Sequence, residues 1–184
     1  MPIDKNLKGV YNEIMNTIYI TKCEKARSHE FLFYILDKFY GVNKNESDLK
    51  KTEHGKLYFD GVNFKFNITH KGDLVAVAIF DCEVGIDIEQ IKPKDYLKIS
   101  KKYFGTIPKD EKEFFTLWTK AESFVKYSAS SIFTELKKIE IIDDGFVYDG
   151  VKQSIKSKSV YFGEYVLSAT ATNLDFCIKE IEEF

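Results

Sequence analysis

Residues 84–89 have the sequence VGIDIE, in which apolar side chains alternate strictly with other residues. Successive side chains of a β-strand point to opposite faces, so the pattern predicts a strand with one apolar face. Its other face carries Gly85, Asp87 and Glu89, and strand geometry places the two carboxylates roughly 7 Å apart. Because Gly85 has no side chain, we expect this face to have room for a ligand.

Two interpretations fit Asp87 and Glu89. In the first, they form the solvated face of an amphipathic strand. In the second, they hold a hard cation such as Mg²⁺, since two close carboxylates repel each other unless a cation or protons lie between them. Magnesium prefers oxygen ligands and keeps positions for water and phosphate. The alternation alone leaves both interpretations open.

The rest of the chain predicts an α+β fold. Helices are expected at 23–40, 96–104 and from 108 to about 127, and strands at 57–59, 64–68, 74–80, 84–89, 136–142, 146–148, 159–162 and 165–172. This order predicts a pseudo-two-fold pair of similar α+β lobes, each with a helix packed on a small, largely antiparallel sheet. We place the N-terminal lobe at residues 1–90 and the C-terminal lobe at 91–184.

Composition narrows the class of protein. The formal net charge is -2, whereas nucleic-acid binders usually carry a basic excess. The three cysteines are far apart and lack CxxC spacing, which argues against a disulfide framework or a zinc site. Residues 1–9 lack an apolar signal core, and the apolar run at 74–80 is far shorter than the roughly 20 residues of a membrane helix. We expect a cytoplasmic protein with no nucleic-acid or membrane partner.

A second carboxylate lies in the segment 114–127, FFTLWTKAESFVKY. At about 100° per residue, its apolar side chains form one stripe, and Glu122 and Lys126 lie together on the flank. A Glu–Lys pair at this spacing is a common surface stabiliser. Alternatively, Glu122 faces Asp87 and Glu89 and completes a three-carboxylate site, with Lys126 one turn away to neutralise phosphate charge.

Three motifs in this order resemble those of the Sfp-type 4'-phosphopantetheinyl transferases. They are FNITH at 66–70, VGIDIE at 84–89 and LWTKAESFVK at 117–126, and Gly55-Lys56 is similar to a reduced Gly-Lys-Pro segment of the family. The resemblance implies that coenzyme A binds between two lobes with Mg²⁺ on its diphosphate. A serine of an acyl or peptidyl carrier protein would then attack the phosphorus next to the pantetheine.

The resemblance also implies roles for individual residues. It makes the metal ligands Asp87, Glu89 and Glu122, and makes Glu122 or Glu89 the base toward the serine. Lys126 would stabilise the phosphate or the leaving group. Coenzyme A would be bound by Thr69 and His70 at its phosphates, Lys56 at the nucleotide end and, more weakly supported, Arg27 at the 3'-phosphate. A solvated helix charge explains Arg27 equally well.

The chain departs from the family pattern in several places. Ala121 stands where the family usually has Lys, and Lys120 lies about 200° around the helix from Glu122. Lys71 replaces a serine often found there, and Ala129 and Ser131 replace glycines. These departures favour, as an alternative, a non-catalytic relative that binds coenzyme A or a carrier protein. A different Mg²⁺-dependent nucleotide enzyme is a further alternative, although the sequence contains no P-loop.

A cluster of lysines follows the carboxylate strand. Between residues 91 and 102 it comprises Lys92, Lys94, Lys98, Lys101 and Lys102, with Asp95 as the opposing charge. The cluster is either a solvated face or a docking surface for an acidic carrier protein. Because two lobes in one chain would build the cleft without a partner subunit, we expect a monomer.

Overall fold

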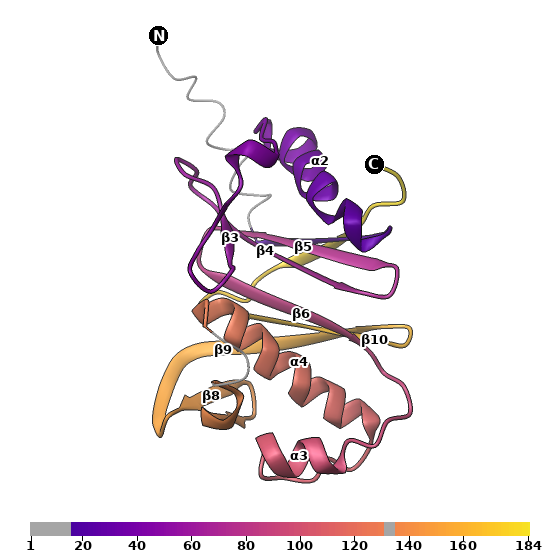
Figure 1. The fold of residues 1–184 in the computed structure, drawn as a ribbon, viewed down its shortest axis with the longest axis vertical. Helices are drawn as coiled ribbons and strands as arrows, with labels where there is room; N and C mark the ends of the chain where they lie inside the picture. Colours follow the sequence, from indigo (N-terminus) through magenta and orange to yellow (C-terminus); the bar gives the residue numbers. More distant parts are fainter. Residues whose placement is uncertain (1–15, 131–134) are drawn as a thin grey trace.

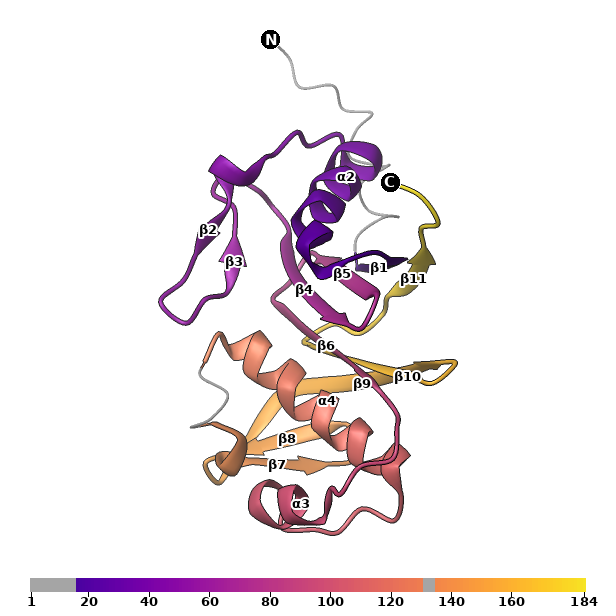
Figure 2. The ribbon, with the colours of Figure 1, turned by 45° about the vertical axis from the view of Figure 1, so that its right-hand side comes forward.

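The computed structural model describes residues 16–130 and 135–184, so the expectations for residues 1–9 and Ser131 lie outside the described residues. Two β-sheets pack face to face, and helices cover their outer faces (Figures 1 and 2). The predicted α+β class is confirmed. In the described part of the chain, no helix is both long enough and apolar enough to cross a membrane.

The first sheet has the strand order β11-β1-β5-β4. Its strands are β11 (Cys177–Glu180), β1 (Thr17–Lys22), β5 (Leu74–Phe80) and β4 (Lys65–Lys71). Strand β1 pairs parallel with β11 and antiparallel with β5, which pairs antiparallel with β4. Strand β4 is therefore an edge, and its neighbour in space is a strand of the other sheet.

The second sheet is antiparallel and has the order β6-β10-β9-β8-β7. Its strands are β6 (Val84–Gln90), β10 (Tyr165–Ala171), β9 (Val151–Phe162), β8 (Gly145–Tyr148) and β7 (Ile139–Ile142). A short ribbon, β2 (Lys50–Lys51) with β3 (Leu57–Tyr58), lies beside the first sheet. Strand β6 belongs to the second sheet and the C-terminal β11 to the first, and the division of the chain at residue 90 stays a prediction.

The helices have recognisable capping residues at some of their ends. They are α2 (Ser28–Tyr40), α3 (Leu97–Tyr103) and α4 (Glu111–Ser128), with 3-10 turns η1 (Lys25–Arg27), η2 (Glu46–Asp48) and η3 (Leu136–Lys138). Gly41 ends α2 in the left-handed conformation at φ 62°. The Asp110 side chain caps α4 by accepting the Glu113 N–H over 2.8 Å. Ala129 ends α4 with φ 50°, a conformation that favours glycine.

The sheets meet through one apolar core. Alternate residues of β1 and β5 pack there against Val84, Ile86 and Ile88 of β6 and against alternate residues of β10. The predicted apolar face of β6 is thus buried between the sheets. Its other face meets α4, whose buried side chains Phe124 and Val125 pack on the outer face of the second sheet. The alternation of residues 84–89 therefore turns Asp87 and Glu89 toward α4.

The elements that differ from the sequence expectations include β1, β11, η3 and β9. Strands β1 and β11 were not predicted, although Thr17–Lys22 reads TIYITK, a run of β-branched and aromatic residues that favours a strand. Residues 136–138 form the turn η3 rather than the start of a strand. Strand β9 begins at Val151, eight residues before the predicted start at 159, because it continues along β8 as well as β10.

Candidate active site

Strand β4 reaches strand β6 through a row of side chains that we call the β4 ladder, Asn67, Thr69 and Lys71. These residues alternate along β4 and so share a face. The Asn67 side-chain oxygen accepts the Ile86 N–H over 2.9 Å. The hydroxyl of Thr69 lies 3.3 Å from Asp87 Oδ1, and the ammonium of Lys71 lies 2.5 Å from Glu89 Oε2. The ladder joins the edges of the two sheets and fixes both carboxylates.

Helix α4 closes the site from the other side, and Gly85 allows its close approach. A Cβ at Gly85 would lie 2.1 Å from the Ser123 carbonyl oxygen and 2.3 Å from the Tyr127 nitrogen. The expectation that Gly85 leaves room for a ligand is therefore wrong, since the helix backbone occupies that space. Buried hydroxyl pairs hold α4 on β10, for example Ser123 Oγ with Thr170 Oγ1 at 2.7 Å.

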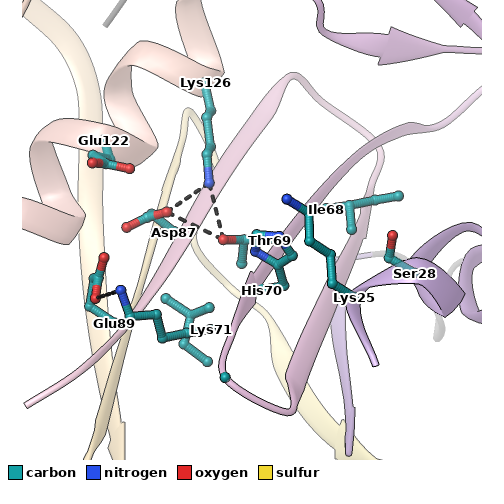
Figure 3. Close-up of a pocket in the computed structure, with 12 residues that line it drawn as sticks. Lys25, Ser28, Ile68, Thr69, His70, Lys71, Asp87, Glu89, Glu122 and Lys126 are labelled. Carbon is teal, nitrogen blue, oxygen red and sulfur yellow. Dashed lines mark hydrogen bonds and ion pairs between the residues drawn. The ribbon is translucent and has the colours of Figure 1, made fainter. Parts of the chain in front are cut away.

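Lys126 links α4 to both strands. Its ammonium donates to Asp87 Oδ1 over 2.7 Å and to Thr69 Oγ1 over 3.0 Å (Figure 3). Asp87 is 4% exposed, and a buried carboxylate needs such a neutralising partner. The second oxygen of Asp87, Oδ2, is buried without a hydrogen-bond partner among the described residues. Asp87 is therefore held through one oxygen, and the other can accept a further ligand.

Glu122 lies one turn before Lys126, beside the same carboxylates (Figure 3). Burial, and after it the negative charge of Asp87, raise the pKa of Glu122 to about 8, against the opposing effect of Lys126. A carboxyl group in this position favours a bound proton or a nearby cation at neutral pH. The structure thus places Glu122 facing the carboxylate strand, as in the second interpretation of residues 114–127.

One cavity of about 620 Å³ collects most of the predicted site residues. Its lining includes Thr69, His70, Asp87, Glu89, Glu122 and Lys126 (Figure 3). It also includes Lys25, Ser28 and Lys71, which sequence analysis did not assign to the site. Lys71 directly follows the FNITH motif and shares the strand face of Thr69, a signal that could have identified it. Lys25 and Ser28 are placed there only by tertiary packing.

Lys56 lines a neighbouring cavity of about 650 Å³, and Glu122 and Lys126 line it too. Its ammonium donates to Glu83, to the Val84 carbonyl over 3.0 Å and to the Tyr127 carbonyl over 3.2 Å. These contacts use the three donors of the group, and burial lowers its pKa. Lys56 therefore ties the start of β6 to the end of α4.

Arg27 points away from the main cavity. It donates to Glu30 over 2.9 Å and to the Phe184 carbonyl over 3.2 Å, and its guanidinium lies 4.3 Å from the centre of the Phe184 ring. Lys120 also points elsewhere, since its ammonium donates to the Asp143 carbonyl over 2.6 Å, in the turn between β7 and β8. This agrees with its position opposite Glu122 on α4.

No protein-family model matches the chain. It is 32% identical over 153 residues to the 4'-phosphopantetheinyl transferase psf-1 of Bacillus pumilus, covering 70% of this chain and 65% of that protein. It is 28% identical over 157 residues to a 4'-phosphopantetheinyl transferase of Bacillus subtilis, covering 76% of this chain and 70% of that protein.

The similarity extends to the 4'-phosphopantetheinyl transferase Sfp of Bacillus subtilis strain 168, at 30% identity over 118 residues, 58% of this chain and 52% of that protein. The chain thus spans between 52% and 70% of the length of these three relatives. The matches agree with the three sequence motifs and with the gathering of their residues around one cavity. The chain is thus similar to Sfp-type 4'-phosphopantetheinyl transferases over 58–76% of its length.

Proposed function

We propose that the protein transfers 4'-phosphopantetheine from coenzyme A to a serine of an acyl or peptidyl carrier protein, with Mg²⁺ as cofactor. One observation carries the proposal: three carboxylates and Lys126 line a single cavity, and Asp87 offers a buried oxygen without a partner in the described residues. The names of the similar proteins support the same activity.

The donor set fits a hard divalent cation. Carboxylate oxygens are the ligands that Mg²⁺ prefers, and the candidates are Asp87, Glu89 and Glu122. As the side chains stand, no three His, Cys, Asp or Glu residues within 16–130 and 135–184 form a group that could hold a metal. Lys126 and Lys71 instead neutralise Asp87 and Glu89. Loading the site would therefore replace ammonium contacts, and bound Mg²⁺ would supply charge neutralisation at the diphosphate.

The reaction moves one 4'-phosphopantetheinyl group. The serine Oγ forms a bond to the phosphorus next to the pantetheine, and the bond from that phosphorus to the bridging oxygen breaks. The leaving group is adenosine 3',5'-bisphosphate, and the serine proton passes to a base. Glu122 suits this role because it lines the cavity beside Asp87 and Lys126, and Glu89 remains the second candidate.

The remaining groups of the cavity bind and orient phosphate. Lys126 is placed to stabilise negative charge on the transferred group or the leaving oxygen. Thr69 and His70 supply hydrogen bonds from β4, and Lys25 and Ser28 approach from η1 and α2. Because one chain supplies both sheets and α4, we propose that the protein acts as a monomer.

The direct test incubates the protein with coenzyme A, Mg²⁺ and a panel of apo carrier proteins from fatty-acid, polyketide and nonribosomal-peptide synthesis. Mass spectrometry then follows the mass of each carrier. We expect the phosphopantetheine adduct on at least one carrier, and its loss when EDTA removes the metal. If coenzyme A binds but no carrier is modified, the protein is instead a non-catalytic coenzyme A-binding relative.

A further inference from the structure

We propose that Lys71 is a positioning residue that couples the binding of Mg²⁺ to the binding of coenzyme A. Its ammonium holds Glu89 in the free protein and moves to a phosphate of coenzyme A when Mg²⁺ and coenzyme A bind. The proposal rests on the proposed function. It assigns a role to a lysine at a position where the resembling family often has serine.

The geometry of the β4 ladder carries this proposal. Lys71 is its third member, two residues beyond Thr69 on the same face of β4, and its ammonium lies 2.5 Å from Glu89 Oε2. Both residues line the main cavity, and the close-up shows the Lys71 side chain directed toward the Glu89 carboxylate (Figure 3). The Lys71 ammonium thus contacts the Glu89 carboxylate, which we assign as a ligand of the cation.

The formal charges of the cavity indicate what this ion pair does. Its lining contains three carboxylates, Asp87, Glu89 and Glu122, and three lysines, Lys25, Lys71 and Lys126. Lysines that offset the carboxylates weaken the attraction for a divalent cation alone, and such a cavity accepts the cation best together with an anion. Removing Lys71 makes the cavity more negative by one charge, which favours the metal alone and disfavours the phosphates of coenzyme A.

Lys71 is better suited than Lys126 to exchange its carboxylate partner for a phosphate of coenzyme A. Lys126 contacts both Asp87 and Thr69, and the Asp87 side chain is 6% exposed. The Lys71 and Glu89 side chains are 32% and 17% exposed, so solvent screens their ion pair and lowers the cost of separating them. The flexible stem of lysine lets its ammonium reach a phosphate while its backbone stays in β4.

The test measures binding without a carrier protein. Mn²⁺ serves as the probe for the metal, by paramagnetic resonance of the free ion, and calorimetry in EDTA gives the affinity for coenzyme A. In Lys71→Ser, we expect Mn²⁺ to bind about two- to fivefold tighter and coenzyme A to bind more weakly by a similar factor, the range for a partly exposed ion pair. A purely structural role for Lys71 would not move the two affinities in opposite directions.

Three further variants control the result. Lys65→Ser removes the same charge from an exposed position on β4 outside the main cavity, and we expect both affinities to stay at wild-type values. Lys71→Arg retains the charge and should resemble the wild type. Lys71→Met keeps most of the apolar stem and carries the test if the serine variant does not fold.

Mn²⁺ binding that is unchanged or weaker in Lys71→Ser and Lys71→Met would overturn the proposal, and so would the absence of Mn²⁺ binding in every variant. Failure of the proposed function is a different result. It would appear as a lack of carrier modification by a protein whose affinities for Mn²⁺ and coenzyme A still respond to Lys71 as described.

Discussion

The ammonium of Lys126 on α4 donates to Oδ1 of Asp87 on β6 over 2.7 Å. This contact joins the helix to the carboxylate strand, and Thr69 of β4 shares it at 3.0 Å from the same ammonium. Three elements from separate parts of the sequence thus meet at one buried carboxylate. The site depends on how closely α4 and β4 approach β6, and the following predictions test this arrangement.

Replacing Lys126 with methionine removes the cation while keeping most of the apolar stem. Because positive charge placed at a transferring phosphoryl group is worth a large rate factor, we expect the turnover rate of carrier modification to fall about 100-fold or more. The measurement is the initial rate with saturating coenzyme A and carrier. A circular dichroism spectrum like that of the wild type would show that the fold is retained.

The matched control is Lys120→Met, on the same helix. Lys120 donates to the Asp143 carbonyl on the opposite side of α4 from the cavity, so its loss should change the rate by no more than about twofold. A loss as large as that of Lys126→Met would show that Lys120 takes the place of the lysine absent at Ala121, and our assignment of the helix faces would then be wrong.

The close packing at Gly85 predicts a stability effect. Alanine there would place its Cβ 2.1 Å from the Ser123 carbonyl oxygen and 2.3 Å from the Tyr127 nitrogen, so α4 or β6 must move. We expect Gly85→Ala to lower the free energy of unfolding by about 1–3 kcal/mol or more, measured by denaturant titration.

Gly145→Ala is the control for Gly85→Ala, since the nearest atom to its added Cβ lies 3.7 Å away. Its free energy of unfolding should remain within about 0.5 kcal/mol of the wild type. Equal stabilities of the two variants would contradict the close contact between α4 and β6.

The raised pKa of Glu122 predicts how the free energy of unfolding depends on pH in the absence of metal. Burial and the charge of Asp87 raise its pKa in the folded state to about 8 from an ordinary value of 4.5. Between these values the folded state binds more protons than the unfolded state, so this contribution to stability is complete below pH 4.5 and is lost as the pH rises through 8.

Glu122→Gln resembles the protonated acid at every pH. In EDTA, its melting temperature should therefore rise relative to the wild type as the pH increases from about 5 to 9. The measurement is a series of thermal unfolding curves for both proteins at each pH. A difference that stays constant across this range would show that Glu122 has an ordinary pKa.

The lysines around α3 predict charge-steered docking of the carrier. Lys98, Lys101 and Lys102 are exposed, as are the apolar side chains of Leu97 and Ile107. Changing the three lysines to glutamate should raise the apparent KM for an acidic carrier about tenfold at low salt, and added salt should reduce the difference. The KM for coenzyme A should stay the same. An unchanged carrier KM would disprove this docking surface.

Local sequence patterns predicted the elements that carry most of the site. The alternation at 84–89 and the helical period at 114–127 give strand β6 and helix α4, and their phases turn Asp87, Glu89 and Glu122 toward one another. Both segments have a strongly periodic pattern of apolar residues, and secondary structure is predicted most reliably from such patterns. Strands β1 and β11 were missed, and β11 has only four residues at the sheet edge.

The contacts between elements could not be predicted from these patterns. A glycine on a strand face is compatible with space for a ligand or with a close helix, and packing decides in favour of α4 at Gly85. Arg27 and Lys25 lie in the same turn η1, yet the chain path directs Lys25 to the cavity and Arg27 to Phe184. Such choices depend on residues distant in sequence.

The central claim is that Asp87 organises a metal-dependent transfer of phosphopantetheine. The most direct measurement is the mass of an apo carrier protein after incubation with coenzyme A, Mg²⁺ and either the wild-type protein or Asp87→Asn, which keeps the shape of the side chain but removes its charge. We predict a phosphopantetheine adduct on the carrier serine with the wild type and none with Asp87→Asn over the same time. Full modification by Asp87→Asn, or none by the wild type on any carrier, would contradict the claim.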